Sequence, residues 1–444
     1  MWRALLAGVL ALGLGTAGGA EPLSLRAALE LARQRSGEAL AGRERAQAAA
    51  ERVRQAKGFR LPSLSLQEIF TRTNSPAEAF ALKLNQERFS FADFMSSDPN
   101  RPDPLDAAIT RIEATLPLFT GGELAGRIAQ AELAARAASG QARWAAEQAA
   151  LAAGEAYVML EQAREYVALL EKARETVAAH VRVAEAFAEQ GMLVQSEVLR
   201  ARVELSRLDD LVAEARGRAR VAEANLAFRL GREQGTVWEL ETLPAPDPVT
   251  GTYEEWASAA EARPDLVAAR DLLAAGEREE RVRRAAFLPK IGVVARADWV
   301  DDRLFGTHGS STAVLAVASI NLFAGGSDRA AVAAARHEAR AGREDVSRFA
   351  EGVKLEVRQA FEEASTARQR HATAWQAVAA AREAERITEE RFRAGVVRML
   401  DLLDAATARR EAETRELVAR ADAQLALMCL AVRAGRPADA VLPE

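Results

Sequence analysis

The sequence lacks the residues on which most enzymes and nucleic-acid-binding proteins depend. It has one cysteine, Cys429, so no disulfide can form within the chain. Its four histidines are scattered, and neither a His-Glu-x-x-His pattern nor a phosphate-binding loop occurs, so we expect no metal, no cofactor and no catalytic residue. The net charge is only −5 and no basic stripe is present, which argues against nucleic acid as a partner. We therefore do not expect an enzyme.

Long apolar runs are also absent, except at the start of the chain. Residues 1–20 combine a cationic start at Arg3, an apolar run over residues 4–14 and small residues at 18–20. That run is shorter than the roughly 20 apolar residues of a membrane-spanning helix. The pattern is typical of a secretory signal peptide, which we expect to end near Glu21.

Proline is missing between Gly121 and Gly231, and this helical stretch recurs later in the chain. Residues that match across a constant separation of 204 are Phe119 and Phe323, Gly122 and Gly326, Leu151 and Leu355, Tyr157 and Phe361, Gly191 and Gly395, and Gly231 and Gly435. A gapless match of glycines and aromatics indicates an internal duplication. We expect repeats over residues 21–243 and 244–444, joined through the proline-rich crossing at 238–251.

Four short segments have a period of two, with one apolar face, and predict β-strands. They lie near residues 61–71, 111–119, 288–299 and 312–323. Glu68 is an exception on the apolar side of the first. The segment 73–108 contains four prolines and several phenylalanines, and we expect a long ordered loop there.

The remaining segments predict helices, over residues 23–58, 121–191, 254–286 and 327–434, with helical hairpins turning near Gly191 and Gly395. About 70 helical residues in one run would extend about 100 Å. After Gly191, apolar residues recur every seven positions, at Val198, Leu205, Val212, Ala219 and Leu226. That spacing fits supercoiled packing and also an ordinary core stripe; the helix length favours the first.

An export signal, no spanning helix and four amphipathic strands together suggest the wall of an outer membrane barrel. A small soluble sheet is the alternative. Four strands are too few to close a barrel, since the smallest have about eight, and open edges are not tolerated in lipid. If these strands span the membrane, the protein must oligomerise, with the inter-strand loops on one side and the helices in the periplasm.

At this point the chain resembles the TolC-like outer membrane efflux proteins over essentially its whole length after residue 20. The resemblance is carried by Leu118-Phe119-Thr120-Gly121-Gly122, Leu322-Phe323-Ala324-Gly325-Gly326, Arg263-Pro264-Asp265-Leu266, Leu84-Asn85-Gln86-Glu87-Arg88-Phe89 with Asp93-Phe94, and Gly395 followed by Leu400-Asp401-Leu402-Leu403-Asp404-Ala405. It implies a mixed α and β membrane protein. Its long α-helical hairpins would form a periplasmic α-barrel, and its four transmembrane strands would contribute to the twelve-stranded β-barrel of a homotrimer. A mixed collar would come from the crossing and the C-terminal tail.

The resemblance also implies functional residues at the two hairpins. Those expected to dock an adaptor at the tips are Gly191, Met192, Leu193, Gly395, Val396 and Val397. Those expected to line a constriction, or gate, are Ser196, Glu197, Asp401 and Asp404. Without the resemblance, Asp401 and Asp404 are better interpreted as carboxylates at a helix N-terminus, where the helix dipole favours negative charge. The chain departs from the best-known pattern at Phe392, where a tyrosine occurs, and at Val397, where an arginine occurs.

The function implied is transport across the cell outer membrane, with most of the chain in the periplasm. The protein would be a passive duct that accepts cargo from a periplasmic adaptor protein and an inner-membrane efflux pump or secretion ATPase. A soluble periplasmic coiled-coil scaffold is the alternative. Neither the cargo nor the pump class follows from the sequence.

Overall fold

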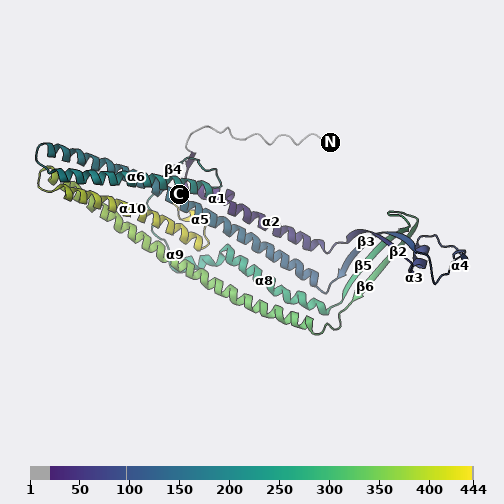
Figure 1. Cartoon of the computed structure of the whole chain (residues 1–444). Coiled ribbons are helices and arrows are strands. Elements are labelled where there is room, and N and C mark those ends of the chain that lie inside the picture. The colour runs from purple at the N-terminus through teal and green to yellow at the C-terminus, as the bar shows by residue number, and fades with distance from the viewer. Residues whose placement is uncertain (1–20, 97, 443–444) are drawn as a thin grey trace, which may run out of the picture. The chain divides into compact units, whose positions relative to one another are not determined.

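The computed structural model describes residues 21–96 and 98–442, so the expected signal peptide over residues 1–20 lies outside the described residues (Figure 1). The chain divides into two compact units. Unit 1 is drawn from Met1–Glu44, Gly140–Leu266 and Phe349–Glu444, and unit 2 from Arg45–Ser139 and Val267–Arg348. The sheet with its adjoining helix segments lies in unit 2, and both helical hairpin turns lie in unit 1.

Unit 2 contains one four-stranded antiparallel sheet in the order β2-β3-β5-β6. Its strands are β2 (Ser63–Thr73), β3 (Leu105–Phe119), β5 (Lys290–Asp301) and β6 (Gly309–Ser319). β2 and β6 each pair on one side only, so the sheet is open at both edges. Figure 1 shows both inter-strand connections at the same end of the sheet. The prediction of four strands is confirmed.

Register gives the sheet one mainly apolar face and one mixed face, because residues paired across antiparallel strands point to the same side. The mixed face combines polar residues with Ile69, Ile109, Val294, Leu315 and Val317. The apolar face carries Leu64, Leu66, Phe70, Ile112, Leu116, Val293, Ala295, Ala297, Val314 and Ala316. The opposite face carries Ser63, Ser65, Gln67, Arg111, Glu113, Arg296, Asp298 and Ser311, and Arg111 forms a bidentate ion pair with Asp298 at 2.8 and 2.9 Å. Glu68 lies on the apolar face, where it accepts hydrogen bonds from Thr110 Oγ1 and from the backbone N–H of Phe305.

Strand bounds differ from the sequence pattern at several ends. β3 begins six residues before the expected 111, because residues 105–110 pair with the far half of β2. β6 ends at Ser319 rather than 323, because its partner Lys290 is preceded by Pro289, which has no N–H to extend the ladder. Ile320, within the segment 312–323 expected as the fourth strand, therefore lies just outside the strand.

The connection between β2 and β3, expected to be a long ordered loop, also includes helical structure. It contains α3 (Pro76–Asn85) and α4 (Asp93–Ser96). Pro76 occupies the first helical turn, where its missing N–H costs nothing and its fixed φ favours the helix. The segment is ordered, as expected, but the sequence analysis did not identify these two short helices.

Four long helices of matched length form the two hairpins. α5 (Glu123–Glu189) and α9 (Ser327–Arg393) have 67 residues each, and α6 (Gln195–Arg229) and α10 (Met399–Arg433) have 35 each. Each helix of the second pair begins and ends 204 residues after its counterpart, which is the offset found in the sequence. None of the helices in residues 21–442 combines the length and apolar character of a membrane span.

The shorter helices are more divided than the sequence indicated. Residues 23–58 form two helices, α1 (Leu25–Arg35) and α2 (Gly37–Gly58), with a break at Ser36, whose Oγ accepts from the Ala39 N–H and so starts the second helix. Residues 254–286 likewise divide into α7 (Tyr253–Ala259), the 3-10 turn η1 (Ala260–Ala262), α8 (Pro264–Arg284) and the 3-10 turn η2 (Ala285–Phe287). Pro264 begins α8 at the point of division.

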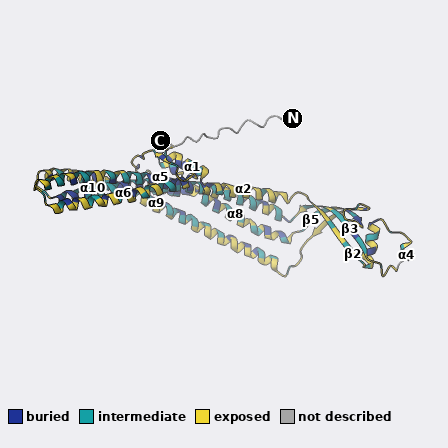
Figure 2. Cartoon of the chain, turned by 45° about the horizontal axis from the view of Figure 1, so that its top comes forward, coloured by how far each residue is buried: buried dark blue, intermediate teal, exposed yellow. Residues whose placement is uncertain are grey.

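Unit 1 also contains the mixed structure expected of the crossing and the tail. β1 (Glu21–Leu23) pairs in parallel with β4 (Trp238–Leu240), and the 3-10 helix η3 (Ala438–Val441) follows α10. The buried hydroxyl of Tyr157 on α5 lies 2.9 Å from the carbonyl oxygens of both Leu23 and Glu241. Figure 2 shows many buried residues gathered where α1 and α5 lie near the C-terminal end.

Candidate functional site

The two hairpin turns of unit 1 have the same backbone geometry. Gly191 and Gly395 have φ of 74° and 72°, the left-handed region that favours glycine. Each is followed by a residue whose N–H donates back into the preceding helix, from Met192 to the Phe187 carbonyl and from Val396 to the Arg391 carbonyl, both at 2.9 Å. This is a glycine-terminated helix end. Glycine at these positions therefore sets how the chain turns from one helix into the next.

The side chains expected at the tips divide into two groups. Met192 and Val396 are 60% and 71% exposed, so they can contact another molecule. Leu193 and Val397 are half-buried and pack on the apolar cluster beneath the turns. Of these four side chains, Met192 and Val396 therefore offer apolar surface outward, while Leu193 and Val397 support the turns from within.

Phe392, where the resemblance implied a tyrosine, belongs to that cluster. It is buried and stacks on Phe187 with ring centroids 5.9 Å apart. A phenylalanine here contributes apolar packing and no hydrogen bond. The two hairpins are consequently joined near the tips by aromatic contact, α5 to α9.

Two of the expected gate carboxylates meet at the start of α10. Glu197 Oε2 accepts a hydrogen bond from the Met399 N–H at 3.1 Å, and Asp401 Oδ2 accepts one from the Arg398 N–H at 2.9 Å. Unpaired N–H groups and the positive end of the helix dipole favour carboxylates at this place. The helix-capping interpretation of Asp401 therefore describes this chain. For Glu197 the structure adds a link from α6 to α10 that the sequence did not indicate.

The other two expected gate residues are differently placed. Asp404 and Ser196 are exposed, and within residues 21–442 neither forms a hydrogen bond or ion pair through its side chain. Asp404 lies about one turn beyond Asp401 on α10. Of the three expected gate carboxylates, Asp404 is therefore the one that can bind an ion from solution.

A second link between α6 and α10 was missed by sequence reasoning. Arg410 and Glu204 form an ion pair at 3.0 Å, and their side chains are only 11% and 17% exposed. The sequence shows opposite charges on two helices that each carry an apolar stripe. Which charges pair, however, depends on the register of the two helices. Together with Glu197, this pair fastens α6 to α10 over the first turns of both helices.

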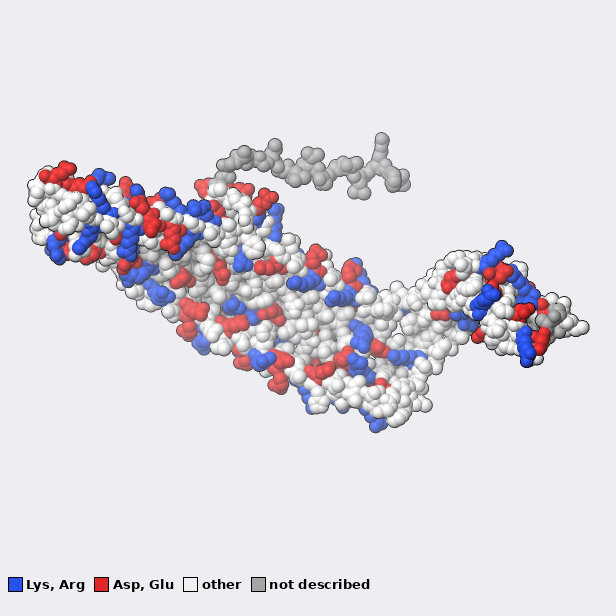
Figure 3. All heavy atoms as spheres, viewed as in Figure 1, with Lys and Arg blue, Asp and Glu red and all other residues white. Residues whose placement is uncertain are grey.

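A layer of buried polar groups lies further along α5, α9 and α10. Glu385 and Arg409 form an ion pair at 2.9 Å with side chains 8% and 15% exposed, and burial raises the pKa of Glu385 against the effect of Arg409. Burial also lowers the pKa of His180 on α5. Buried charges are costly unless paired, so such a layer disfavours sliding of one helix past another. Figure 3 shows the outer surface of α6 and α10 covered by charges of both signs.

Within the described parts of the chain, no three His, Cys, Asp or Glu side chains are grouped so that they could hold a metal ion. The polar groups at the tips cap helices or face solvent. The arrangement can attract ions and contact a partner.

Comparison with known proteins agrees with this geometry. Residues 257–436 match the family model described as "Outer membrane efflux protein", and no curated protein matches the sequence. Among solved structures, the fold is similar to a membrane protein from Pseudomonas aeruginosa (TM-score 0.78, 19% identity, 93% of each chain). It is also similar to CusC, studied for transmembrane channel formation (0.78, 15%, 93% of this chain and 92% of that one).

A third similar structure is the outer membrane protein VceC from Vibrio cholerae (TM-score 0.73, 19% identity, 93% of this chain and 96% of that one). These likenesses cover almost the whole described chain, including the first half that the family model does not reach. Residues 257–436 thus match the outer membrane efflux protein family, and the described chain as a whole has the fold of these TolC-like proteins.

Proposed function

We propose that this protein is the outer membrane channel of a tripartite efflux or type I secretion system. It acts as a homotrimer and a passive export duct, docking a periplasmic adaptor and, through it, an inner-membrane pump or secretion ATPase. In this proposal residues 1–20 are a signal peptide, and residues 21–243 and 244–444 are two structural repeats. Each contributes one pair of strands and one periplasmic hairpin.

The observation that carries the proposal is the open sheet with one apolar face. Leu64, Leu66 and Phe70 are 74%, 64% and 57% exposed, and Val314 on the far edge strand is 77% exposed. Contiguous apolar surface of this kind is unfavourable in water and favourable in lipid. Both sheet edges also carry unpaired backbone groups, which lipid does not satisfy. Three copies would supply twelve strands and close the barrel.

The competing function, a soluble periplasmic scaffold, would leave this apolar face in water. Membrane fractionation separates the two. A barrel protein stays in the outer membrane fraction through carbonate and high-salt washes and gives an oligomer band that resists heat on gels. Release of the protein into the soluble fraction by either wash would favour the scaffold. Co-purification of an adaptor and a pump then identifies the system served.

The hairpin turns give the first prediction. Gly191→Val and Gly395→Val should abolish export while leaving the trimer in the membrane, because a β-branched residue strains the left-handed conformation by at least about 1–2 kcal/mol. Steric clash does not contribute, since no other atom lies within 4 Å of either added Cβ. Export is measured by complementation of a strain that lacks the channel.

Gly352→Val is the matched control for that experiment. Gly352 also has open space around its Cβ, but it lies within α9 in ordinary helical conformation. This variant should export normally. Normal export by the Gly191 and Gly395 variants as well would contradict a docking role for the turns.

The carboxylates Glu197, Asp401 and Asp404 give the second prediction, which concerns the gate. Threefold symmetry would bring nine carboxylates close to the channel axis, where they attract cations. The pore should be cation-selective in planar bilayers and blocked by multivalent cations, with weaker block at low pH. Asp401→Ala combined with Asp404→Ala should remove most of the block. Because Asp401 caps α10 and Asp404 faces solvent, Asp404→Asn alone should remove more than Asp401→Asn.

Glu411→Gln is the control for the gate experiment, because Glu411 is another exposed carboxylate of α10. It should leave both selectivity and block unchanged. If the Asp401, Asp404 double variant keeps wild-type conductance, selectivity and block, these carboxylates only stabilise helix ends and the gate lies elsewhere.

A further inference from the structure

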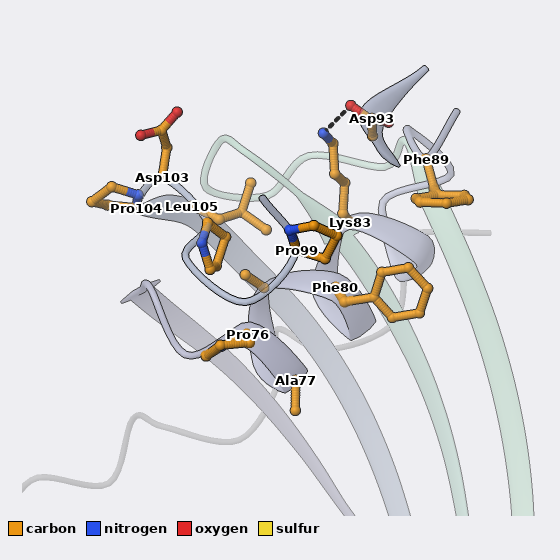
Figure 4. Close-up of a pocket in the computed structure, with 12 residues that line it drawn as sticks. Pro76, Ala77, Phe80, Lys83, Phe89, Asp93, Pro99, Asp103, Pro104 and Leu105 are labelled. Carbon is orange, nitrogen blue, oxygen red and sulfur yellow. Dashed lines mark hydrogen bonds and ion pairs between the residues drawn. The ribbon is translucent and has the colours of Figure 1, made fainter. Parts of the chain in front are cut away.

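The segment that joins β2 and β3 carries a pocket that the channel function does not use. The pocket lies wholly in unit 2, between α3 and residues 99–105, and has a volume of about 470 Å³ (Figure 4). Pockets that bind small molecules usually have about 300–1,000 Å³. Its described lining is Pro76, Ala77, Ala79, Phe80, Lys83, Phe89, Asp93, Pro99, Pro102, Asp103, Pro104 and Leu105.

The part of the segment that follows α3 is fastened to the end of the sheet. The buried amide of Gln86, just after α3, donates to the carbonyl oxygens of Asp106 and Asp301 at 3.0 and 3.2 Å. Arg88 forms ion pairs with Asp301 and Asp302 at 3.1 and 2.6 Å. Gly309 completes the fit, because a Cβ there would lie 1.8 Å from the Asn85 carbonyl oxygen. These contacts explain the Gln86-Glu87-Arg88 motif seen in the sequence.

The pocket wall is apolar and stiff. Four of its residues are prolines, which have fixed φ and no N–H to offer a ligand. Phe80 and Phe89 pack edge to face with centroids 5.2 Å apart. Figure 4 shows Phe80 and Phe89 on one side of the pocket and Pro104 and Leu105 on the other. Because such a wall is already ordered, little conformational entropy of the protein is lost when a ligand binds.

The charges of the lining favour a cation. Lys83 forms an ion pair with Asp93, and this hydrogen bond lowers the pKa of Asp93, so the two charges cancel at neutral pH. Asp103 forms no hydrogen bond or ion pair with any described residue, which leaves the described lining one negative charge in excess. Aromatic rings attract cations through their faces. Apolar walls, rings and an uncompensated carboxylate together fit a molecule with an apolar body and a positive charge.

We propose that this pocket binds small aromatic cations, with the ring against Phe80 and the prolines and the positive group near Asp103. The site is separate from the hairpin tips, and binding there requires neither a pore nor an adaptor. The barrel placement puts it on the side of the membrane opposite the helices, where the ligand would arrive from outside the cell.

The test uses phenyltrimethylammonium as the probe and the full-length protein in a non-ionic detergent, with binding followed by saturation-transfer NMR. Wild-type protein should bind the probe with a Kd of about 0.1–1 mM, a range open to ligands of this size. The anion benzenesulfonate should not bind measurably. Asp103→Asn should weaken probe binding about three- to tenfold, and Phe80→Leu, which keeps apolar bulk, about two- to fivefold.

Asp98→Asn is the matched control, because it removes a negative charge from the same segment at a residue that does not line the pocket, and asparagine keeps the oxygen that accepts from the Asn100 N–H. It should leave the affinity unchanged. The proposal is overturned if wild-type protein binds the anion as well as the cation, if it binds neither, or if Asp103→Asn behaves like Asp98→Asn. Channel conductance measured on the same preparations tests the proposed function separately.

Discussion

Replacing Arg263 by methionine should destabilise unit 1 by up to about 3 kcal/mol, because it leaves the part-buried carboxylates of Asp265 and Glu356 without their buried cation. Arg263 is 1% exposed. Its guanidinium holds Asp265 through two hydrogen bonds of 2.8 and 2.9 Å and Glu356 through one of 2.7 Å. It also lies 4.6 Å from the ring centroid of Trp144. The change should lower the urea midpoint of unfolding, followed by circular dichroism.

Two further variants distinguish this explanation from a general effect of losing an arginine. Arg263→Lys keeps the charge but cannot reproduce the bidentate pair, so it should fall between wild type and methionine. Arg283→Met removes an arginine that is 49% exposed and paired with Glu279, and it should cost less than about 1 kcal/mol. Equal losses for Arg263→Met and Arg283→Met would show that the buried network contributes little.

Arginine on the apolar face of the sheet should produce the second large effect. Leu66→Arg, Leu116→Arg and Val293→Arg should each cost about 2–4 kcal/mol near the membrane midplane. The amount of heat-resistant trimer in the outer membrane fraction should fall sharply, because a charged guanidinium must then leave water for hydrocarbon. The trimer is measured by gel densitometry against total protein.

Ser65→Arg is the matched control, one residue away from Leu66 on the same strand. Ser65 lies on the mixed face opposite Glu113, which would attract the new charge. Its trimer yield should stay near that of wild type. Unchanged yield in all three apolar-face variants would mean that this face does not meet lipid.

Local patterns in the sequence were sufficient for the four strands, the long helices and their order. A period of two identified the four strands, because alternating apolar and polar residues indicate a strand with one apolar face, whichever strands it pairs with. The constant offset between Gly191 and Gly395, and between Gly231 and Gly435, indicated helices of matched length. These glycines mark helix ends, because glycine is favoured where a helix ends in the left-handed conformation. In the folded sheet, register places Leu66, Leu116 and Val293 on the same face.

Contacts between distant residues were decided by the tertiary structure alone. Glu197 accepts from a backbone N–H 202 residues away, and Gln86 donates to a carbonyl 215 residues away. A periodic pattern within one segment cannot predict such partners, because each contact depends on how two separate elements are placed relative to each other. The same reason hid the ion pair between Glu204 and Arg410 and the network around Arg263. The sequence by itself determined which segments are helix or strand and which faces are apolar, whereas the capping role of Glu197, the fastening of the segment between β2 and β3, and its pocket exist only in the folded chain.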